Sequence, residues 1–239
     1  MRIASALLLA IAIGLPLLVV LPPRPLMRAF ADAHPEVLFY VETDRQVVAL
    51  TLDDGPNPQV TPQILDLLAD YDAHATFFLL GDKVPGNEDL RDRMRAEGHE
   101  LGNHLFEDRV SLGLSPQNFE HQLTRTDSLL SFDANSGDKW LRPGSGWFTD
   151  RMVEQSAEHG YRLALGSVYP HDLLLQSPKL ISEFILKRAY AGSVLILHDG
   201  DEDSERTLAV LRRVLPLLKE RGFEFLTLTE LSALKSRES

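Results

Sequence analysis

The sequence predicts an α/β fold, a distorted and incomplete (β/α) barrel of about seven parallel strands that forms a single domain. Short apolar runs alternate with amphipathic segments between residues 46 and 232, and this alternation is typical of parallel strands joined by right-handed helical crossovers. A repeat of roughly 27 residues suits either a compact barrel or an open doubly wound sheet. Polar residues follow five of the predicted strands. Because a closed barrel brings all of these strand ends to one mouth, we favour the barrel.

The first predicted strand, residues 47–52, is the segment around which the others are arranged. Its run of Val, Ala, Leu and Thr lacks a clear alternation of apolar and polar residues, which is typical of a parallel strand buried on both faces. The run ends at Asp53-Asp54-Gly55-Pro56. Six further strands are expected, at residues 75–80, 100–102, 140–142, 163–166, 193–197 and 223–226.

Helices are expected between these strands, and most begin at a residue that suits a helix N-terminus. Ser and Thr side chains accept hydrogen bonds from the free N–H groups of the first turn, and proline fits that turn. The predicted caps are Thr61, Ser115, Thr149 and Ser177. Further helices are expected at residues 88–97 and 206–221 and after Thr229.

The composition excludes several kinds of partner and chemistry. The net charge is −11 and no basic stripe is visible, so nucleic acid is not an expected partner. The chain has no cysteine, which excludes disulfides, thiolate ligands and a cysteine nucleophile. It also has no Gly-x-Ser-x-Gly elbow and no phosphate-binding Gly-x-x-x-x-Gly-Lys loop. No pattern in the sequence sets an oligomeric state.

The N-terminal segment differs from the rest of the chain. Arg2 precedes an almost wholly apolar, uncharged run over residues 3–21, which prolines follow. Such a run is typical of a secretory signal peptide or a single membrane anchor. We therefore expect residues 1–25 to direct export to the cell envelope, where the protein is anchored or secreted, and to make any membrane contact. The remainder is divided into a linker at 26–45, the domain at 46–232 and a tail at 233–239.

Asp53 and Asp54 place two adjacent carboxylates at a strand end. Their like charges repel, and a metal ion or a basic partner would relieve the repulsion. Taken alone, Asp-Asp-Gly-Pro is better explained as an ordinary turn, because these residue types are common in turns. The downstream residues favour a functional role.

His104 and Asp108 follow the third predicted strand. If the segment makes one helical turn, their side chains share a face. With an aspartate from the first strand they would form a site of nitrogen and oxygen donors for Zn²⁺ or another divalent first-row ion. Glu107 is a rival ligand, and the alternative is an exposed histidine with a solvated aspartate.

His198 and Arg142 each lie at the end of a predicted strand. An imidazole after a buried strand can donate a proton to a leaving group, although a structural histidine bonded to a carbonyl fits the same position. Arg142 can orient a catalytic carboxylate. The glycines that follow it allow a backbone N–H to approach an oxyanion, and the alternative is a glycine-rich turn with an exposed arginine.

Four motifs, in this order, resemble those of the polysaccharide deacetylases, carbohydrate esterase family 4. They are Thr51–Pro56 for the first motif, Gly98–His104 for the second, Leu141–Gly144 for the third and Val194–His198 for the fifth. The resemblance covers about residues 46 to 232. It implies metal-dependent removal of acetyl groups from N-acetylated sugars, so that the expected partner is an N-acetylated glycan.

The resemblance also implies roles for single residues. Asp53 would be the general base, oriented by Arg142, and His198 would be the general acid. The expected cofactor is a divalent metal ion, zinc or else manganese, iron or cobalt, bound by Asp54, His104 and Asp108. Asp172 matches one of the two aspartates of the fourth motif and is also a predicted catalytic residue.

The chain departs from the family pattern at three places. Asp108 stands where a second histidine is usual, which makes a harder, more negative site that favours Mn²⁺ or Fe²⁺. Gly144-Ser145 replaces the usual proline and aromatic residue of the third motif, and Trp147 is a candidate substitute. The fourth motif, Asp-x-x-Asp-Trp in the family, is Tyr169-Pro170-His171-Asp172-Leu173 in this chain.

The leading hypothesis is an exported, metal-dependent N-deacetylase that acts on peptidoglycan, a chitin-type oligomer or another envelope polysaccharide. One alternative is a metal amidohydrolase that uses the same residues on a small non-sugar amide. The other is a catalytically decayed, glycan-binding envelope protein, and the retention of both Asp53 and His198 argues against decay.

Overall fold

The computed structural model describes residues 24–132, 139–200 and 204–235, and the chain divides into two units at Pro35. In the first unit, helix α2 (Arg24–Ala33) buries none of its residues. Its exposed Leu26 and Phe30 are four positions apart, so they lie on one face of the helix. No helix of the described residues is long and apolar enough to cross a membrane. Residues 3–21, on which the signal or anchor prediction depends, lie outside them.

The second unit is built on a sheet that has eight strands within the described residues. They are β1 (Val37–Leu38), β2 (Val47–Gly55), β3 (Thr76–Leu79), β4 (Glu100–Asn103), β5 (Lys139–Leu141), β6 (Tyr161–Ala164), β7 (Ser193–His198) and β8 (Glu224–Leu226). The helices are α3 (Thr61–Asp70), α4 (Glu88–Ala96), α5 (Pro116–Leu130), α6 (Asp150–Glu158), α7 (Pro178–Arg188), α8 (Ser204–Glu220) and α9 (Leu228–Lys235). The prediction of parallel strands joined by helices is confirmed.

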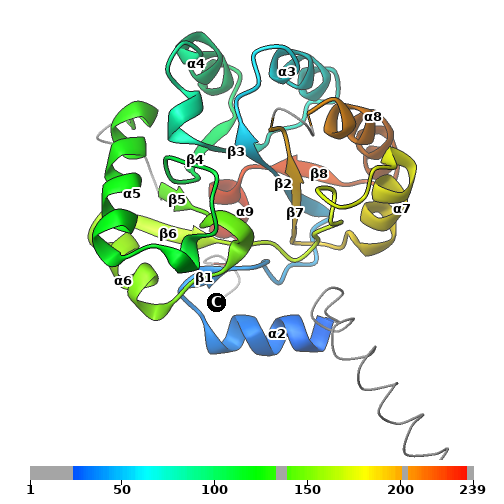
Figure 1. Ribbon diagram of the computed structural model, residues 1–239. Coiled ribbons are helices and arrows are strands. Elements are labelled where there is room, and N and C mark those ends of the chain that lie inside the picture. The colour runs from blue at the N-terminus through cyan, green and yellow to red at the C-terminus, as the bar shows by residue number, and fades with distance from the viewer. Residues whose placement is uncertain (1–23, 133–138, 201–203, 236–239) are drawn as a thin grey trace, which may run out of the picture. The chain divides into compact units, whose positions relative to one another are not determined.

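The strand order is β1-β6-β5-β4-β3-β2-β7, and β8 also pairs with β2. Every ladder between named strands is parallel. β3 pairs with the second half of β2, while β8 pairs with its first half. Helices α3 to α8 lie around the outside of the strands (Figure 1), as a (β/α) barrel requires.

The barrel is distorted where β6 meets β7. Val168, which follows β6, makes a single parallel bridge with Leu195 of β7. The Ile196 amide donates to the carbonyl oxygen of Val168 at 3.0 Å, and the Val168 amide donates to that of Val194 at 3.1 Å. This short seam closes the ring in place of a full ladder, which confirms the expected incomplete barrel.

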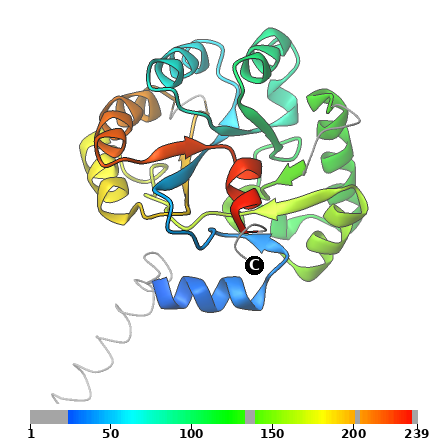
Figure 2. The ribbon, with the colours of Figure 1, turned by 180° about the vertical axis from the view of Figure 1, so that it is seen from behind.

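The two faces of β2 divide the core. Val48, Leu50 and Leu52 pack in the layer between the sheet and the outer helices, whereas Val47 and Ala49 pack in the barrel interior. Leu228 and Leu231 of α9 join the interior cluster beside the first half of β2. Helix α9 therefore covers the end of the barrel that lies away from Asp53 and Asp54, and Figure 2 shows it from that side.

Three of the four predicted caps are confirmed, and the fourth is wrong. Ser115, Thr149 and Ser177 each accept a hydrogen bond from a backbone N–H of the first turn that follows. The N-cap of α3 is Val60, without a side-chain bond. Thr61 is the first helical residue, and its hydroxyl bonds to Asp199 instead.

The predicted linker and tail need correction as well. Within residues 26–45, Val37 and Leu38 pair with β6, and Val41 is 1% exposed. These residues belong to the folded domain, because all three are buried and the side chains of Leu38 and Val41 pack in the barrel interior. At the other end α9 runs to Lys235, and Leu234 packs in the same cluster. The domain therefore extends beyond residue 232 into the predicted tail.

Candidate active site

Asp53 lies at the mouth of the barrel and bonds to Arg142. Side chains alternate along a strand, so Thr51 and Asp53 share the interior face of β2 with Val47 and Ala49. The Arg142 Nη1 is 2.6 Å from Asp53 Oδ1. Both side chains are almost completely buried, at 3% exposure for Asp53 and 2% for Arg142. A buried carboxylate needs such a partner, and this one is a charge-assisted hydrogen bond.

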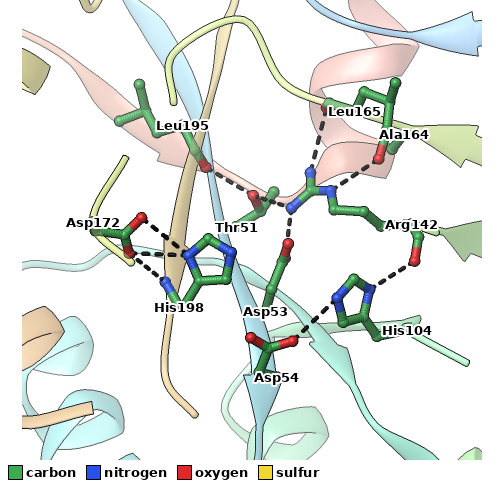
Figure 3. A network of polar contacts seen from close by, with 10 residues as sticks. All are labelled: Thr51, Asp53, Asp54, His104, Arg142, Ala164, Leu165, Asp172, Leu195 and His198. Carbon is green, nitrogen blue, oxygen red and sulfur yellow. Dashed lines mark hydrogen bonds and ion pairs between the residues drawn. The ribbon is translucent and has the colours of Figure 1, made fainter. Parts of the chain in front are cut away.

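The guanidinium of Arg142 is held by four oxygen atoms (Figure 3). Besides Asp53, it donates to the Thr51 hydroxyl at 2.7 Å, to the Ala164 carbonyl at 3.0 Å and to the Leu165 carbonyl at 3.3 Å. The Thr51 hydroxyl in turn donates to the Leu195 carbonyl at 2.8 Å. These bonds fix the direction from which Arg142 approaches Asp53. The expected pairing of Arg142 with Asp53 is what the structure contains.

Asp54 faces the same mouth because β2 bulges at this residue. Strict alternation would point Asp54 away from Asp53, toward the helices. The register of β2 against β3 shifts between Asp53 and Gly55, and Asp54 has a left-handed φ of 70°. A bulge of this kind re-aims a side chain. It turns the Asp54 carboxylate toward His104, whose Nε2 lies 3.2 Å from Asp54 Oδ1 (Figure 3).

His104 is oriented by its other ring nitrogen. Nδ1 lies 2.6 Å from the Arg142 carbonyl oxygen, so Nδ1–H donates there and Nε2 points to Asp54. A backbone carbonyl on the second nitrogen is the usual way in which a metal-binding imidazole is oriented. Burial raises the pKa of Asp54, but the hydrogen bond and the charge of His104 lower it to about 2. Asp54 and His104 therefore present a carboxylate oxygen and a ring nitrogen to one point.

The structure does not bring Asp108 to this pair. Residues 104–110 form bends and no helical turn, and both Glu107 and Asp108 are exposed. The amides of Gly81 and Asp82 donate to the carbonyls of Leu105 and Phe106, which holds the segment in this shape. Within the described ranges, no group of three His, Asp or Glu side chains is arranged to hold a metal ion. The prediction that His104 and Asp108 share a face required a helical turn, and residues 104–110 contain none.

His198 and Asp172 form a second pair at the mouth. His198 Nδ1 lies 3.0 Å from both Asp172 carboxylate oxygens, and the His198 amide also donates to Asp172, at 2.9 Å. Asp172 is 1% exposed. Burial lowers the pKa of His198, but the hydrogen bond and charge of Asp172, with the charges of Asp53 and Asp54, raise it to about 9. The imidazole is therefore protonated at neutral pH, and Nε2 is the nitrogen left to act outward.

Sequence reasoning missed two residues of this site. Thr51 bonds to Arg142, and the two-residue spacing from Asp53 along one strand could have indicated it. Asp199 is completely buried and bonds to Thr61. It was visible only as the residue after His198, because its partner lies 138 positions away in the sequence.

The fold and the site together are those of an acid–base hydrolase built on a (β/α) barrel. The polysaccharide deacetylase family matches residues 40–164 of the chain. A peptidoglycan-N-acetylglucosamine deacetylase of Bacillus cereus is 34% identical over 214 residues, which cover 86% of this chain and 97% of that protein. A chitooligosaccharide deacetylase of Rhizobium leguminosarum bv. trifolii is 31% identical over 200 residues, which cover 79% and 93%.

Solved structures agree with these relatives. The crystal structure of a peptidoglycan N-acetylglucosamine deacetylase superposes with a TM-score of 0.78 at 28% identity, and the match covers 84% of this chain and 95% of that one. The chain belongs to the polysaccharide deacetylase family, metal-dependent hydrolases that remove N-acetyl groups from amino-sugar polymers.

Proposed function

We propose that the protein is an exported, metal-dependent N-deacetylase that removes acetyl groups from an amino-sugar polymer of the cell envelope. The observation that carries the proposal is the meeting of three pairs at one mouth: Asp53 with Arg142, Asp54 with His104, and His198 with Asp172. The relatives named for peptidoglycan and chitooligosaccharides make these two glycans the first substrates to test.

The residues at the mouth fit a divalent cation in part. Asp54 and His104 would hold it, because their oxygen and nitrogen face each other and the His104 ring is already oriented. Asp108 stays our prediction for a third ligand, and its exposed carboxylate would have to move to reach the pair. A bound cation supplies Lewis-acid polarisation of the amide carbonyl and acidifies water. We propose zinc, with manganese, iron and cobalt as alternatives.

Asp53 is the proposed general base. Arg142 holds the Asp53 carboxylate through Oδ1 and balances its charge, while the bonds to Thr51, Ala164 and Leu165 keep Arg142 in place. A base that cannot rotate stays aligned with the water from which it takes a proton. The water, with that proton removed, then attacks the amide carbon.

His198 is the proposed general acid. Asp172 accepts a hydrogen bond from Nδ1–H, which leaves Nε2–H available to the departing amine. Because the raised pKa keeps the ring protonated at neutral pH, the acid is charged before the substrate arrives. Base and acid are thus two different residues, so that one can take a proton from water while the other gives a proton to the departing amine.

Acetate release from N-acetylglucosamine oligomers tests the proposal. The purified protein should release acetate, a chelator should abolish the release, and added Zn²⁺, Mn²⁺ or Co²⁺ should restore it. Asp53→Asn and His198→Ala should each remove the activity, while Glu120→Gln, at an exposed position, should leave it unchanged. Full activity after complete removal of the metal would contradict the proposal. Faster release from small non-sugar amides would instead favour an amidohydrolase.

A glycan-binding protein without catalysis is a second candidate. The exposed position of Asp108, away from Asp54 and His104, supports it. This candidate predicts binding of chitooligosaccharides that survives Asp53→Asn, with no acetate released by the wild type. Chitooligosaccharide binding and acetate release, both measured on the wild type and on Asp53→Asn, therefore separate the two candidates.

Residues 3–21 support the proposed location outside the cytoplasm. Cell fractionation with an antibody to the domain should find the protein in the envelope or the medium. The mass of the mature protein then distinguishes a cleaved signal peptide from a retained anchor. A full-length protein in the cytoplasm would contradict export.

A further inference from the structure

Asp199 is a buried acid at the mouth that the proposed chemistry does not use. It directly follows His198 and is 0% exposed. Its backbone amide donates to the Asp53 carbonyl at 2.9 Å, at the last residue pair of the ladder between β7 and β2. Asp199 is therefore fixed against the backbone that carries both Asp53 and Asp54.

The side chain of Asp199 connects this strand end to the first turn of α3. Oδ2 accepts a hydrogen bond from the Thr61 hydroxyl at 2.9 Å. The same hydroxyl accepts a bond from the Asn57 amide at 2.8 Å. One carboxyl group thus restrains the loop that runs from the end of β2 into α3.

The carboxyl group of Asp199 lies in the space beside Gly55. A Cβ atom on Gly55 would be 2.4 Å from Asp199 Oδ1 and 2.7 Å from Oδ2, so only glycine fits here. Gly200 approaches from the other side, where a Cβ atom would be 3.1 Å from the Asp54 Cβ. The backbone on either side of the Asp54 bulge is packed against residues 199 and 200.

Asp54 needs such support because its conformation is unfavourable by itself. A non-glycine residue at a φ of 70° is strained, and its carboxylate lies near that of Asp53. Without a restraint the bulge would relax toward ordinary alternation, which turns the Asp54 carboxylate away from His104. Among the residues that the structure describes, none is a hydrogen-bond partner of the buried Asp199 Oδ1. Most buried polar groups in proteins are hydrogen-bonded, so this oxygen calls for an explanation.

We propose that Asp199 is a positioning residue, which acts through Thr61 and Gly55 to hold the Asp54 carboxylate toward His104 for cation binding. The inference rests on the proposed function, because it assumes that Asp54 and His104 bind a cation. In this role Asp199 contacts neither substrate nor metal. Asp199 acts only on the orientation of the Asp54 carboxylate.

Cobalt affinity of the metal-free, full-length protein tests the assignment, with Co²⁺ as the probe and its visible absorption as the signal. Loss of residues that orient a ligand usually weakens metal binding 10- to 100-fold. Asp199→Ala and Thr61→Val should each weaken Co²⁺ binding by about tenfold or more. Thr61→Ser keeps the hydroxyl and should bind Co²⁺ like the wild type. The double variant should bind no more weakly than the worse single variant, because both changes break one connection.

Two controls make the result decisive. Leu218→Ala removes a fully buried side chain of α8 and should lower stability with no change in Co²⁺ affinity. Asp199→Asn keeps the shape without the ability to ionise and should retain most of the affinity, since position and not charge is the proposed role. If Asp199→Ala does not fold, Thr61→Val decides alone.

The outcomes distinguish this inference from the proposed function. Wild-type Co²⁺ affinity in Thr61→Val, or in a folded Asp199→Ala, overturns the role of Asp199 and leaves the proposed function intact. No Co²⁺ or Zn²⁺ binding by the wild-type protein overturns both. Weakened binding in Leu218→Ala to the same degree as in Asp199→Ala would show that stability, and not position, sets the affinity, and would also overturn the role.

Discussion

Replacing Asp172 by asparagine should remove the charge that keeps His198 protonated. The asparagine side chain has nearly the same shape and can still accept a hydrogen bond from Nδ1. Burial, which lowers the pKa of His198, remains, whereas the charge and hydrogen bond of Asp172, which dominate its rise to about 9, are lost. We expect the pKa of His198 in Asp172→Asn to fall to the ordinary value for histidine, about 6.5, or below it.

The size of the effect on activity follows from these two pKa values. At pH 7.5 an imidazole with a pKa of about 9 is roughly 97% protonated, and one with a pKa of about 6.5 is roughly 9% protonated. A general acid works only in its protonated form. Asp172→Asn should therefore lower kcat/KM at pH 7.5 by about tenfold through ionisation alone, and the alkaline limb of its pH profile should move to lower pH.

NMR titration of the His198 ring in the metal-free protein measures the pKa directly. The control is Glu120→Gln, which neutralises the carboxylate 3.2 Å from His159 on the surface and should leave the His198 titration unchanged. A His198 pKa in Asp172→Asn within half a unit of the wild-type value would refute the reasoning.

The same pair makes stability depend on pH in a defined direction. The pKa of His198 is raised on folding, so the pair stabilises the fold fully below the unfolded value of about 6.5, and this contribution is lost as pH rises through about 9. Urea unfolding of the metal-free proteins should show a larger difference between wild type and Asp172→Asn at pH 6 than at pH 9.5. Equal differences at both pH values would contradict the raised pKa.

Three further predictions concern other residues. Arg142→Met should lower the free energy of unfolding, measured with urea, by about 3–5 kcal/mol, because it leaves Asp53 buried without its partner. Adding Asp53→Asn should recover part of this free energy, and additive losses in the double variant would contradict the pairing. Asp108→Asn should weaken Co²⁺ binding more than its neighbour control Glu107→Gln, and equal affinities would remove Asp108 from the ligand set. Burial lowers the pKa of His99 to about 4, so the wild-type fold should lose stability as pH falls from about 6.5 to 4, and His99→Gln should flatten this fall in melting temperature.

The residue types and local spacing were enough to predict the barrel and most of the site. The apolar run of β2 and the caps at Ser115, Thr149 and Ser177 depend on neighbours in the sequence. Polar residues at strand ends come together in any closed parallel barrel, so Asp53 and the later site residues could be grouped before the structure was known.

The features that the sequence could not predict depend on contacts between distant segments. Thr61 has the sequence of a cap, but its hydroxyl is taken by Asp199. The four-residue spacing from His104 to Asp108 matters only in a helix, and the left-handed φ of 66° at Leu105 prevents one. The bulge that turns Asp54 breaks the two-residue period on which strand predictions rely.

The seam at Val168 has a consequence for the catalytic acid. The loop that carries Asp172 leaves the barrel directly after the seam, where only a bridge and a few amide bonds join β6 to β7. Local unfolding of the barrel should begin there. The amide hydrogens of Val168 and Ile196 would then exchange with solvent faster than those of the β2–β7 ladder. Each such opening would separate Asp172 from His198 while the rest of the molecule stays folded. Local opening of the barrel at Val168 would therefore affect the protonation of His198.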